Sequence, residues 1–214
     1  MIKNIIKKIE NNSSSLCLVD EPLKKHTTYG IGGPADLMIF PKSKKDLISV
    51  IEIINENKTD VTILGSGSNI LVSDNGIRGA VISLKKSLKE VRLNENILYA
   101  ECGAMLGKIV RLAVKNNLIG LENLNGVPGT LGGALIMNAG AWGGEISENL
   151  INVELINSKN ELKKVHKKDI NFSYRNSSFN NNDILLSAEF NLKKAKKDLI
   201  KENFSKAQIG RTSS

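Results

Sequence analysis

Cysteine, histidine and long apolar runs are all scarce in this chain of 214 residues. Its two cysteines, Cys17 and Cys102, lie in unrelated apolar contexts, so we expect free thiols in a reducing compartment. No apolar run approaches the roughly 20 residues that span a bilayer. Lysines also interrupt the first ten residues, where a signal peptide would need an apolar core. These absences predict a soluble, cytoplasmic protein with no membrane partner.

Aromatic residues are also few, and this limits the partners that the charge allows. The formal net charge is +8, which raises nucleic acid as a partner. With one Trp, three Tyr and five Phe, however, there is no basic–aromatic interleaving on which bases would stack. The densest lysine run, residues 193–197, is most simply the solvated face of a helix that opens there. We therefore expect no nucleic-acid partner, and an acidic small molecule fits the positive charge better.

The two histidines, His26 and His166, do not group with cysteines or carboxylates at metal-ligand spacing, so no metal is expected. Within residues 26–29, His26 is expected to have a structural role. His166 lies in a lysine-rich hairpin and is expected to be exposed to solvent.

Glycine, in contrast, is concentrated in two places. Seven glycines lie between Gly126 and Glu145, a density too high for an ordinary helix or strand. A second loop, residues 65–69 (Gly-Ser-Gly-Ser-Asn), follows the apolar run of residues 61–64. Two such loops predict a large phosphate-bearing cofactor held from two sides by main-chain N–H groups.

The loop at residues 65–69 differs from the G-x-G-x-x-G fingerprint of dinucleotide-binding folds, because Ile70 takes the place of the third glycine. Residues 70–76 are β-branched and then turn-like, not amphipathic at helical period. We therefore predict strand–loop–strand, with a pyrophosphate bound by amides and by the hydroxyls of Ser66 and Ser68. Two purely structural turns are the alternative interpretation.

The remaining sequence alternates between helical and strand patterns. Helices are predicted at the N-terminus, where Ile2, Ile5, Ile6 and Ile9 share one face, over residues 45–56 and 104–117, and from residue 193 to about residue 208. Strands are predicted over residues 61–64, 80–84 and 184–192, and hairpins over residues 90–100 and 152–165. Composition marks no domain boundary.

Residues 26–36 (His-Thr-Thr-Tyr-Gly-Ile-Gly-Gly-Pro-Ala-Asp), 65–72, 126–145 and the pair Tyr174-Arg175 form an ordered series of motifs. This series resembles the UDP-N-acetylenolpyruvoylglucosamine reductase family over nearly the whole chain. The resemblance implies an α+β, two-lobed FAD-binding fold of the vanillyl-alcohol-oxidase (PCMH) type. It divides the chain into an N-terminal helix and lead-in, two FAD-binding lobes, and a C-terminal helix leading towards a substrate domain: residues 1–27, 28–77, 78–193 and 194–214.

The resemblance also implies the activity. NADPH would reduce FAD, which then reduces UDP-N-acetylglucosamine enolpyruvate to UDP-N-acetylmuramate for peptidoglycan synthesis. Negative charge develops on the substrate carboxylate and α-carbon, and a planar guanidinium suits it. Arg175 matches this catalytic position, and Tyr174 would contact the substrate. Taken without the resemblance, an arginine after a tyrosine is more often a surface charge or a structural ion pair.

The flavin contacts implied by the resemblance lie in the two glycine loops. They are Gly65, Ser66, Gly67, Ser68, Asn69 and Ile70 in the first loop, and Pro128, Gly129, Thr130, Gly133, Asn138, Ala139 and Gly140 in the second. The Thr130 hydroxyl would form a hydrogen bond with a phosphate group, and Asn138 would form a hydrogen bond with either the flavin or the protein backbone. Leu135 and Met137 are expected in the core, while Trp142 either lines the site or packs inside the protein.

The chain departs from the family pattern at its end. Family members continue into a substrate-binding domain, where a serine in a Ser/Ala-x-Gly-Ser-x-Phe pattern protonates the intermediate and a late glutamate assists. Ser213 and Ser214 lack the glycine and phenylalanine of that pattern and are not assigned the role. The chain is then either a fragment or a short form. A flavin-binding module without reductase activity is the alternative function, and an oxidase of the same fold comes third.

Overall fold

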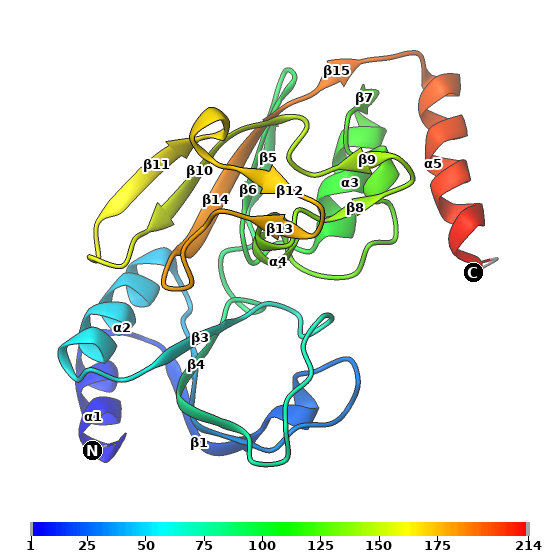
Figure 1. Ribbon diagram of the computed structural model, residues 1–214. Helices are drawn as coiled ribbons and strands as arrows, with labels where there is room; N and C mark the ends of the chain where they lie inside the picture. The colour runs from blue at the N-terminus through cyan, green and yellow to red at the C-terminus, as the bar shows by residue number, and fades with distance from the viewer. Residues whose placement is uncertain (1, 213–214) are drawn as a thin grey trace. The chain divides into compact units, whose positions relative to one another are not determined.

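The computed structural model describes residues 2–212, without the side chains of residues 201 and 206–212. Ser213 and Ser214, to which no role was assigned, lie outside the described residues. The chain divides after Leu88 into two compact units, unit 1 before this point and unit 2 after it (Figure 1). Each unit combines a β-sheet with helices, which agrees with the predicted α+β class.

Unit 1 is built on a four-stranded sheet in the order β1-β2-β4-β3. Its strands are β1 (Leu16–Pro22), β2 (Pro34–Phe40), β3 (Val61–Leu64) and β4 (Ile77–Ser83). β1 is antiparallel to β2, whereas β4 lies between β2 and β3 and is parallel to both. Because β4 has a neighbour on each side, its last four residues are all buried, as is typical of a central parallel strand.

Two helices, α1 (Ile2–Asn12) and α2 (Lys44–Glu56), pack against each other in unit 1 (Figure 1). Ile5 and Ile9 of α1 are fully buried, from the apolar face that the sequence predicted. The apolar periodicity of these two segments therefore gave the correct secondary structure.

Two features of unit 1 correct the sequence analysis. The predicted lobe boundary at Arg78 falls inside β4, which belongs to unit 1 because it pairs with β2 and β3; the units instead divide after Leu88. The strand predicted directly after the 65–69 loop is also wrong. Residues 70–76 form no strand. Their backbone instead accepts a hydrogen bond from the loop before β2, where Gly33 N–H donates to Ser73 O at 2.9 Å.

Unit 2 is built on a five-stranded antiparallel sheet in the order β11-β10-β14-β6-β5. The strands are β5 (Val91–Asn94), β6 (Ile97–Glu101), β10 (Leu150–Ile156), β11 (Leu162–His166) and β14 (Ile184–Asn191). The sequence predicted both hairpins and the long strand β14. In the centre of the sheet, β14 begins with five consecutive buried residues.

Helices and short strand pairs complete unit 2. The helices are α3 (Leu106–Lys115), α4 (Leu131–Ile136) and α5 (Lys197–Thr212). The short pairs are β7 (Leu118–Ile119) with β15 (Lys193–Lys194), β8 (Gly140–Ala141) with β9 (Gly144–Glu145), and β12 (Phe172–Ser173) with β13 (Asn176–Ser177). Two-residue strands carry no periodicity, so sequence analysis did not detect them.

Two parts of unit 2 also differ from expectation. α4 forms inside the glycine-rich run, although its glycine density argued against a helix. Gly132 lets this helix pack closely, because a Cβ there would lie 3.2 Å from Cys102 Cβ. The last helix begins at Lys197 and not at Lys193, because residues 193–194 pair with β7.

Within residues 2–212, no helix has both the length and the apolar character needed to cross a membrane. The same residues contain no group of three or more His, Cys, Asp or Glu side chains that would hold a metal ion. Both cysteines are free, as expected, and burial raises the pKa of the Cys17 thiol to about 11.

Candidate functional site

The first glycine loop follows β3, and its backbone packs on the segment that begins at His26. Gly67 has φ +70°, and a Cβ there would contact the carbonyl oxygen of His26. Thr28 N–H donates to Gly67 O at 2.8 Å, which joins the two segments. Gly67 therefore serves the packing of the protein on itself. This supports the structural interpretation for that one position.

The other predicted residues of this loop remain accessible. Gly65, Ser66, Ser68 and Ile70 are half-buried, and Asn69 is exposed. Ser66 Oγ donates to Ser68 Oγ at 3.3 Å, so the two predicted phosphate-binding hydroxyls lie together. This arrangement is compatible with a phosphate site and equally with a structural turn, because the two hydroxyls bond each other.

His26 has the structural role that was expected. Its Nε2 lies 3.0 Å from Glu21 Oε1, and its ring centroid lies 5.7 Å from that of Phe40. The hydrogen bond with His26 lowers the pKa of the Glu21 carboxyl. This pair fixes the start of the loop on which Gly67 packs.

Sequence analysis missed three exposed apolar side chains on these loops. Tyr29, Ile31 and Leu71 are 63%, 50% and 72% exposed. These exposed side chains lie on the same loops as the Ser66 and Ser68 hydroxyls and as Gly67 or its packing partner. The signal available in the sequence was the position of Tyr29 and Ile31 beside Gly30; Leu71 has no glycine neighbour and gave no such signal.

In unit 2, the second glycine run lies along the segment before α3. Leu106 N–H donates to Gly129 O at 3.0 Å, and Gly132 N–H donates to Cys102 O at 2.9 Å. Gly133 is different, because a Cβ there would meet only Thr130 Oγ1, at 3.9 Å. The backbone at Gly133 is therefore open to a ligand, with the Thr130 hydroxyl beside it. This open surface fits the predicted cradle for a phosphate-bearing cofactor.

The remaining predicted residues of the run are divided between the surface and the interior. Pro128 is exposed, Gly129 and Gly140 are half-buried, and Thr130, Asn138 and Ala139 are buried. Leu135 is in the core, as expected, and Met137 is half-buried. At Gly140 a Cβ would lie 3.1 Å from Glu145 Cγ, so this glycine allows the β8–β9 pairing.

Asn138 connects the glycine run with the predicted substrate residues. Its Nδ2 donates to Glu145 Oε2 at 2.6 Å and to Ser173 O at 3.1 Å. Ser173 immediately precedes Tyr174 and Arg175. The structure therefore brings the end of the glycine run and this pair into one site of unit 2.

Tyr174 and Arg175 form the tip of the β12–β13 hairpin. Tyr174 is 82% exposed, and Arg175, also exposed, has φ +56°. The Arg175 guanidinium lies 5.4 Å from the centroid of the Tyr174 ring. Among the described residues no carboxylate pairs with Arg175, so the interpretation of a structural ion pair finds no support there.

Trp142 occupies the tip of the neighbouring β8–β9 hairpin. It is 49% exposed with φ +53°, so the indole is not packed inside unit 2. The side chain remains available to a ligand.

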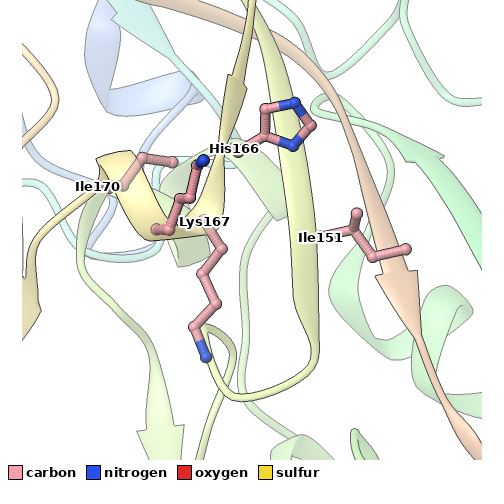
Figure 2. Close-up of a pocket in the computed structure, with 5 residues that line it drawn as sticks. Ile151, His166, Lys167 and Ile170 are labelled. Atoms are coloured by element: carbon pink, nitrogen blue, oxygen red, sulfur yellow. The ribbon is translucent and has the colours of Figure 1, made fainter.

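A depression of about 710 Å³ in unit 2 lies outside this site. It is lined by Lys168 and by the four residues labelled in Figure 2, Ile151, His166, Lys167 and Ile170. None of them belongs to the predicted site. His166 is exposed, as expected for this hairpin.

The FAD binding domain family matches residues 35–166 of this chain, which is more than half of its length. The matched stretch includes both glycine loops and ends before Tyr174. FAD is therefore the cofactor of this domain.

Solved structures agree with this fold. UDP-N-acetylenolpyruvylglucosamine reductase from Thermus caldophilus is 27% identical with a TM-score of 0.76, over 94% of this chain and 70% of that chain. A berberine bridge enzyme variant, a reticuline dehydrogenase, is 13% identical with a TM-score of 0.67, over 90% of this chain and 44% of that one. The second likeness shows the fold alone. The predicted FAD-binding fold of the vanillyl-alcohol-oxidase type is confirmed.

Curated relatives extend the agreement to sequence. UDP-N-acetylenolpyruvoylglucosamine reductase of Clostridioides difficile is 40% identical over 86% of this chain and 60% of the relative's length. The same enzyme of Agathobacter rectalis is 38% identical over 99% of this chain and 71% of the relative. This chain thus spans between 60% and 71% of these two relatives. With the matched FAD domain and the shared motifs, it belongs to the UDP-N-acetylenolpyruvoylglucosamine reductase family.

Proposed function

We propose that this chain is the flavin-binding part of an NADPH-dependent UDP-N-acetylmuramate dehydrogenase. Its substrate would be UDP-N-acetylglucosamine enolpyruvate, and its product a precursor of peptidoglycan. The observation that carries the proposal is the exposed Arg175, which has no carboxylate partner among the described residues and is tied to the glycine run through Ser173. The names and reaction class of the relatives support the same activity.

We infer that FAD is held by the two glycine loops. The residues concerned are Gly65, Ser66, Gly67, Ser68, Asn69 and Ile70 in unit 1, and Pro128, Gly129, Thr130, Gly133, Asn138, Ala139 and Gly140 in unit 2. Gly133 offers open backbone, and Thr130 adds a hydroxyl beside it. Since Asn138 Nδ2 already donates to two protein acceptors and its backbone N–H donates to Leu135 O, we expect any flavin contact of this residue to use one of its oxygen atoms. When bound, FAD supplies the hydride transfer.

Arg175 would grip the substrate carboxylate through two parallel N–H donors. Its permanent charge stabilises the negative charge that develops on the carboxylate and the α-carbon during reduction. Tyr174, exposed beside it, would lie against the substrate. The β12–β13 pairing fixes the backbone from which both side chains extend before the substrate binds.

The alternative function concerns the share of its relatives that this chain spans. Because it spans only 60% of the Clostridioides difficile relative, a flavin-binding module without complete turnover is the alternative. The proton donor expected for the α-carbon belongs to a pattern that residues 210–214 do not contain.

Stopped-flow spectroscopy of the FAD-loaded chain, extended by the substrate-binding domain that carries the expected serine, tests the proposal, since it separates flavin reduction by NADPH from reoxidation by the enolpyruvyl substrate. Arg175→Lys keeps the charge but loses the planar pair of donors. We expect reoxidation to slow by about 10²-fold, the scale of losing one preorganised contact, with flavin reduction unchanged.

Arg111→Lys is the matched control, because Arg111 is an exposed arginine on α3 outside the site. An unchanged reoxidation rate in Arg175→Lys would contradict the role of this arginine. If this extended wild-type protein binds FAD but supports neither half-reaction, the binding-module alternative is correct.

A further inference from the structure

We propose that Asn138 is a positioning residue that couples two hairpin tips of unit 2. One is the β8–β9 tip with Trp142, and the other is the β12–β13 tip with Tyr174 and Arg175. The inference rests on the proposed function, because it concerns the arginine assigned there to the substrate carboxylate.

The side-chain amide of Asn138 forms a fork between the two hairpins. One N–H of Nδ2 donates to Glu145 Oε2 on β9 at 2.6 Å, and the other donates to Ser173 O at the end of β12 at 3.1 Å. Asn138 is only 1% exposed, so water cannot easily take over either bond. Because the amide is planar, the fork fixes the two hairpins in one mutual arrangement.

The backbone of Asn138 is fixed as firmly as its side chain. Its N–H donates to Leu135 O at 3.2 Å, and the next residue, Ala139, donates its N–H to Ala134 O at 2.8 Å. With φ +38° at Asn138, these two bonds form the Schellman ending of α4. Glycine is the usual residue at this position. Asparagine ends the helix here and adds the side chain that reaches both hairpins.

Two further contacts position the groups that accept the hydrogen bonds of Asn138. The missing Cβ of Gly140 leaves room for the Glu145 side chain, since a Cβ there would lie 3.1 Å from Glu145 Cγ. On the opposite strand of the substrate hairpin, Ser177 Oγ donates to Ile136 O at 2.7 Å. The β12–β13 hairpin is thus bonded to the end of α4 through both of its strands.

Asn138 Oδ1 has no hydrogen-bond partner among the described residues, although it is buried. With both Nδ2 hydrogens directed at Glu145 and Ser173, the planar amide has to turn Oδ1 away from these two partners.

Both tips place a large exposed side chain on a backbone with positive φ. Trp142 has φ +53° and Arg175 has φ +56°. Residues other than glycine rarely adopt a positive φ unless the surrounding structure stabilises it. The fork supplies that support to both tips at once, so loosening one tip also loosens the other.

The test uses Asn138→Gly in the ligand-free chain. Glycine keeps the helix ending at positive φ and removes only the fork, so the variant is expected to fold. We expect amide hydrogen exchange in residues 172–177 to become at least about fivefold faster, as for loss of one buried hydrogen bond. Trp142 is the only tryptophan of the chain, so its fluorescence anisotropy should fall in the same variant.

Asn117→Gly is the matched control. Asn117 also has positive φ, +58°, but it is exposed at the turn after α3. We expect this variant to leave both signals at their wild-type values. Glu145→Gln retains an oxygen that accepts the Nδ2 bond and should preserve the Trp142 signal, whereas Glu145→Ala should lower it.

The proposal is overturned if Asn138→Gly matches Asn117→Gly in both signals, or if only one of the two tips responds. Neither readout requires turnover, so a chain without reductase activity would still give the coupling signals. Conversely, if the coupling is absent, FAD binding and the effect of Arg175→Lys would still be observed. The two failures are therefore distinguishable.

Discussion

In unit 1, the missing side chain of Gly67 makes room for the protein itself, whereas in unit 2 the missing side chain of Gly133 leaves a surface open. A Cβ at Gly67 would contact the carbonyl oxygen of His26, while a Cβ at Gly133 would meet only Thr130 Oγ1 at 3.9 Å. Both glycines belong to loops that are similar in composition and both were expected to approach a cofactor. Only the second has the open backbone that such an approach requires.

The glycines of one motif therefore have two different structural roles. Gly67 and Gly140 allow backbone segments or side chains of the protein to come close, and Gly133 leaves backbone accessible to a ligand. Substitution should separate these duties, because the first kind should affect stability and the second kind flavin affinity.

Gly67→Ala should have the largest effect. The added Cβ would overlap the backbone at His26, and alanine also disfavours φ +70°. We expect the free energy of unfolding to fall by about 3 kcal/mol or more, measured by thermal or urea denaturation. Gly30→Ala is the control, because Gly30 has φ +67° but nothing within 4 Å of its Cβ position. Its expected cost is about 1 kcal/mol, and equal losses in both variants would refute a packing role for Gly67.

Gly133→Ala should act in the opposite way. Alanine in the interior of α4 should stabilise the fold by about 0.5–1 kcal/mol, while its methyl group occupies the open surface. We expect FAD affinity to fall by about tenfold, the effect of roughly 1.4 kcal/mol, measured by fluorescence titration. Gly107→Ala on α3, where a Cβ makes only ordinary contacts, should leave FAD affinity unchanged. Unchanged FAD affinity in Gly133→Ala would remove this glycine from the flavin site.

The smallest effect is expected at Glu189, which tests how unit 2 responds to pH. A hydrogen bond from Asn152 first, and then one from Lys164, lowers the pKa of the Glu189 carboxyl. A lowered pKa stabilises the fold above the unfolded value of about 4.3, and this contribution disappears as pH falls through the folded value. Glu189→Gln should therefore cost about 1 kcal/mol near neutral pH, with the difference from wild type vanishing in acid.

Denaturation of wild type and Glu189→Gln at several pH values measures this difference. The control is Glu161→Gln, because Glu161 is paired with Lys163 at 2.9 Å on an exposed turn and should contribute little. A pH-independent difference for Glu189→Gln would show that packing, and not ionisation, explains its effect.

Local patterns predicted the regular elements well. The apolar spacing of α1 and α2, the strand β3 and the hairpins β5–β6 and β10–β11 were all read from residues close together in the sequence. β1 and β2 were missed, although β2 has four consecutive buried residues, because an apolar run this short has no distinctive period. The lobe boundary was misplaced because β4 is defined by its partners, which are distant in the sequence.

The sequence by itself determined the family resemblance, the two glycine-rich loops, the pair Tyr174-Arg175 and most helices and strands, since each depends on residue types at short spacing. Only the tertiary structure decided which glycines face the protein and which face open space, and that the Asn138 amide joins Glu145 to Ser173. Those properties depend on backbone segments that meet after folding. A glycine has the same composition whether its missing Cβ is filled by a neighbour or left open, so no local pattern distinguishes the two.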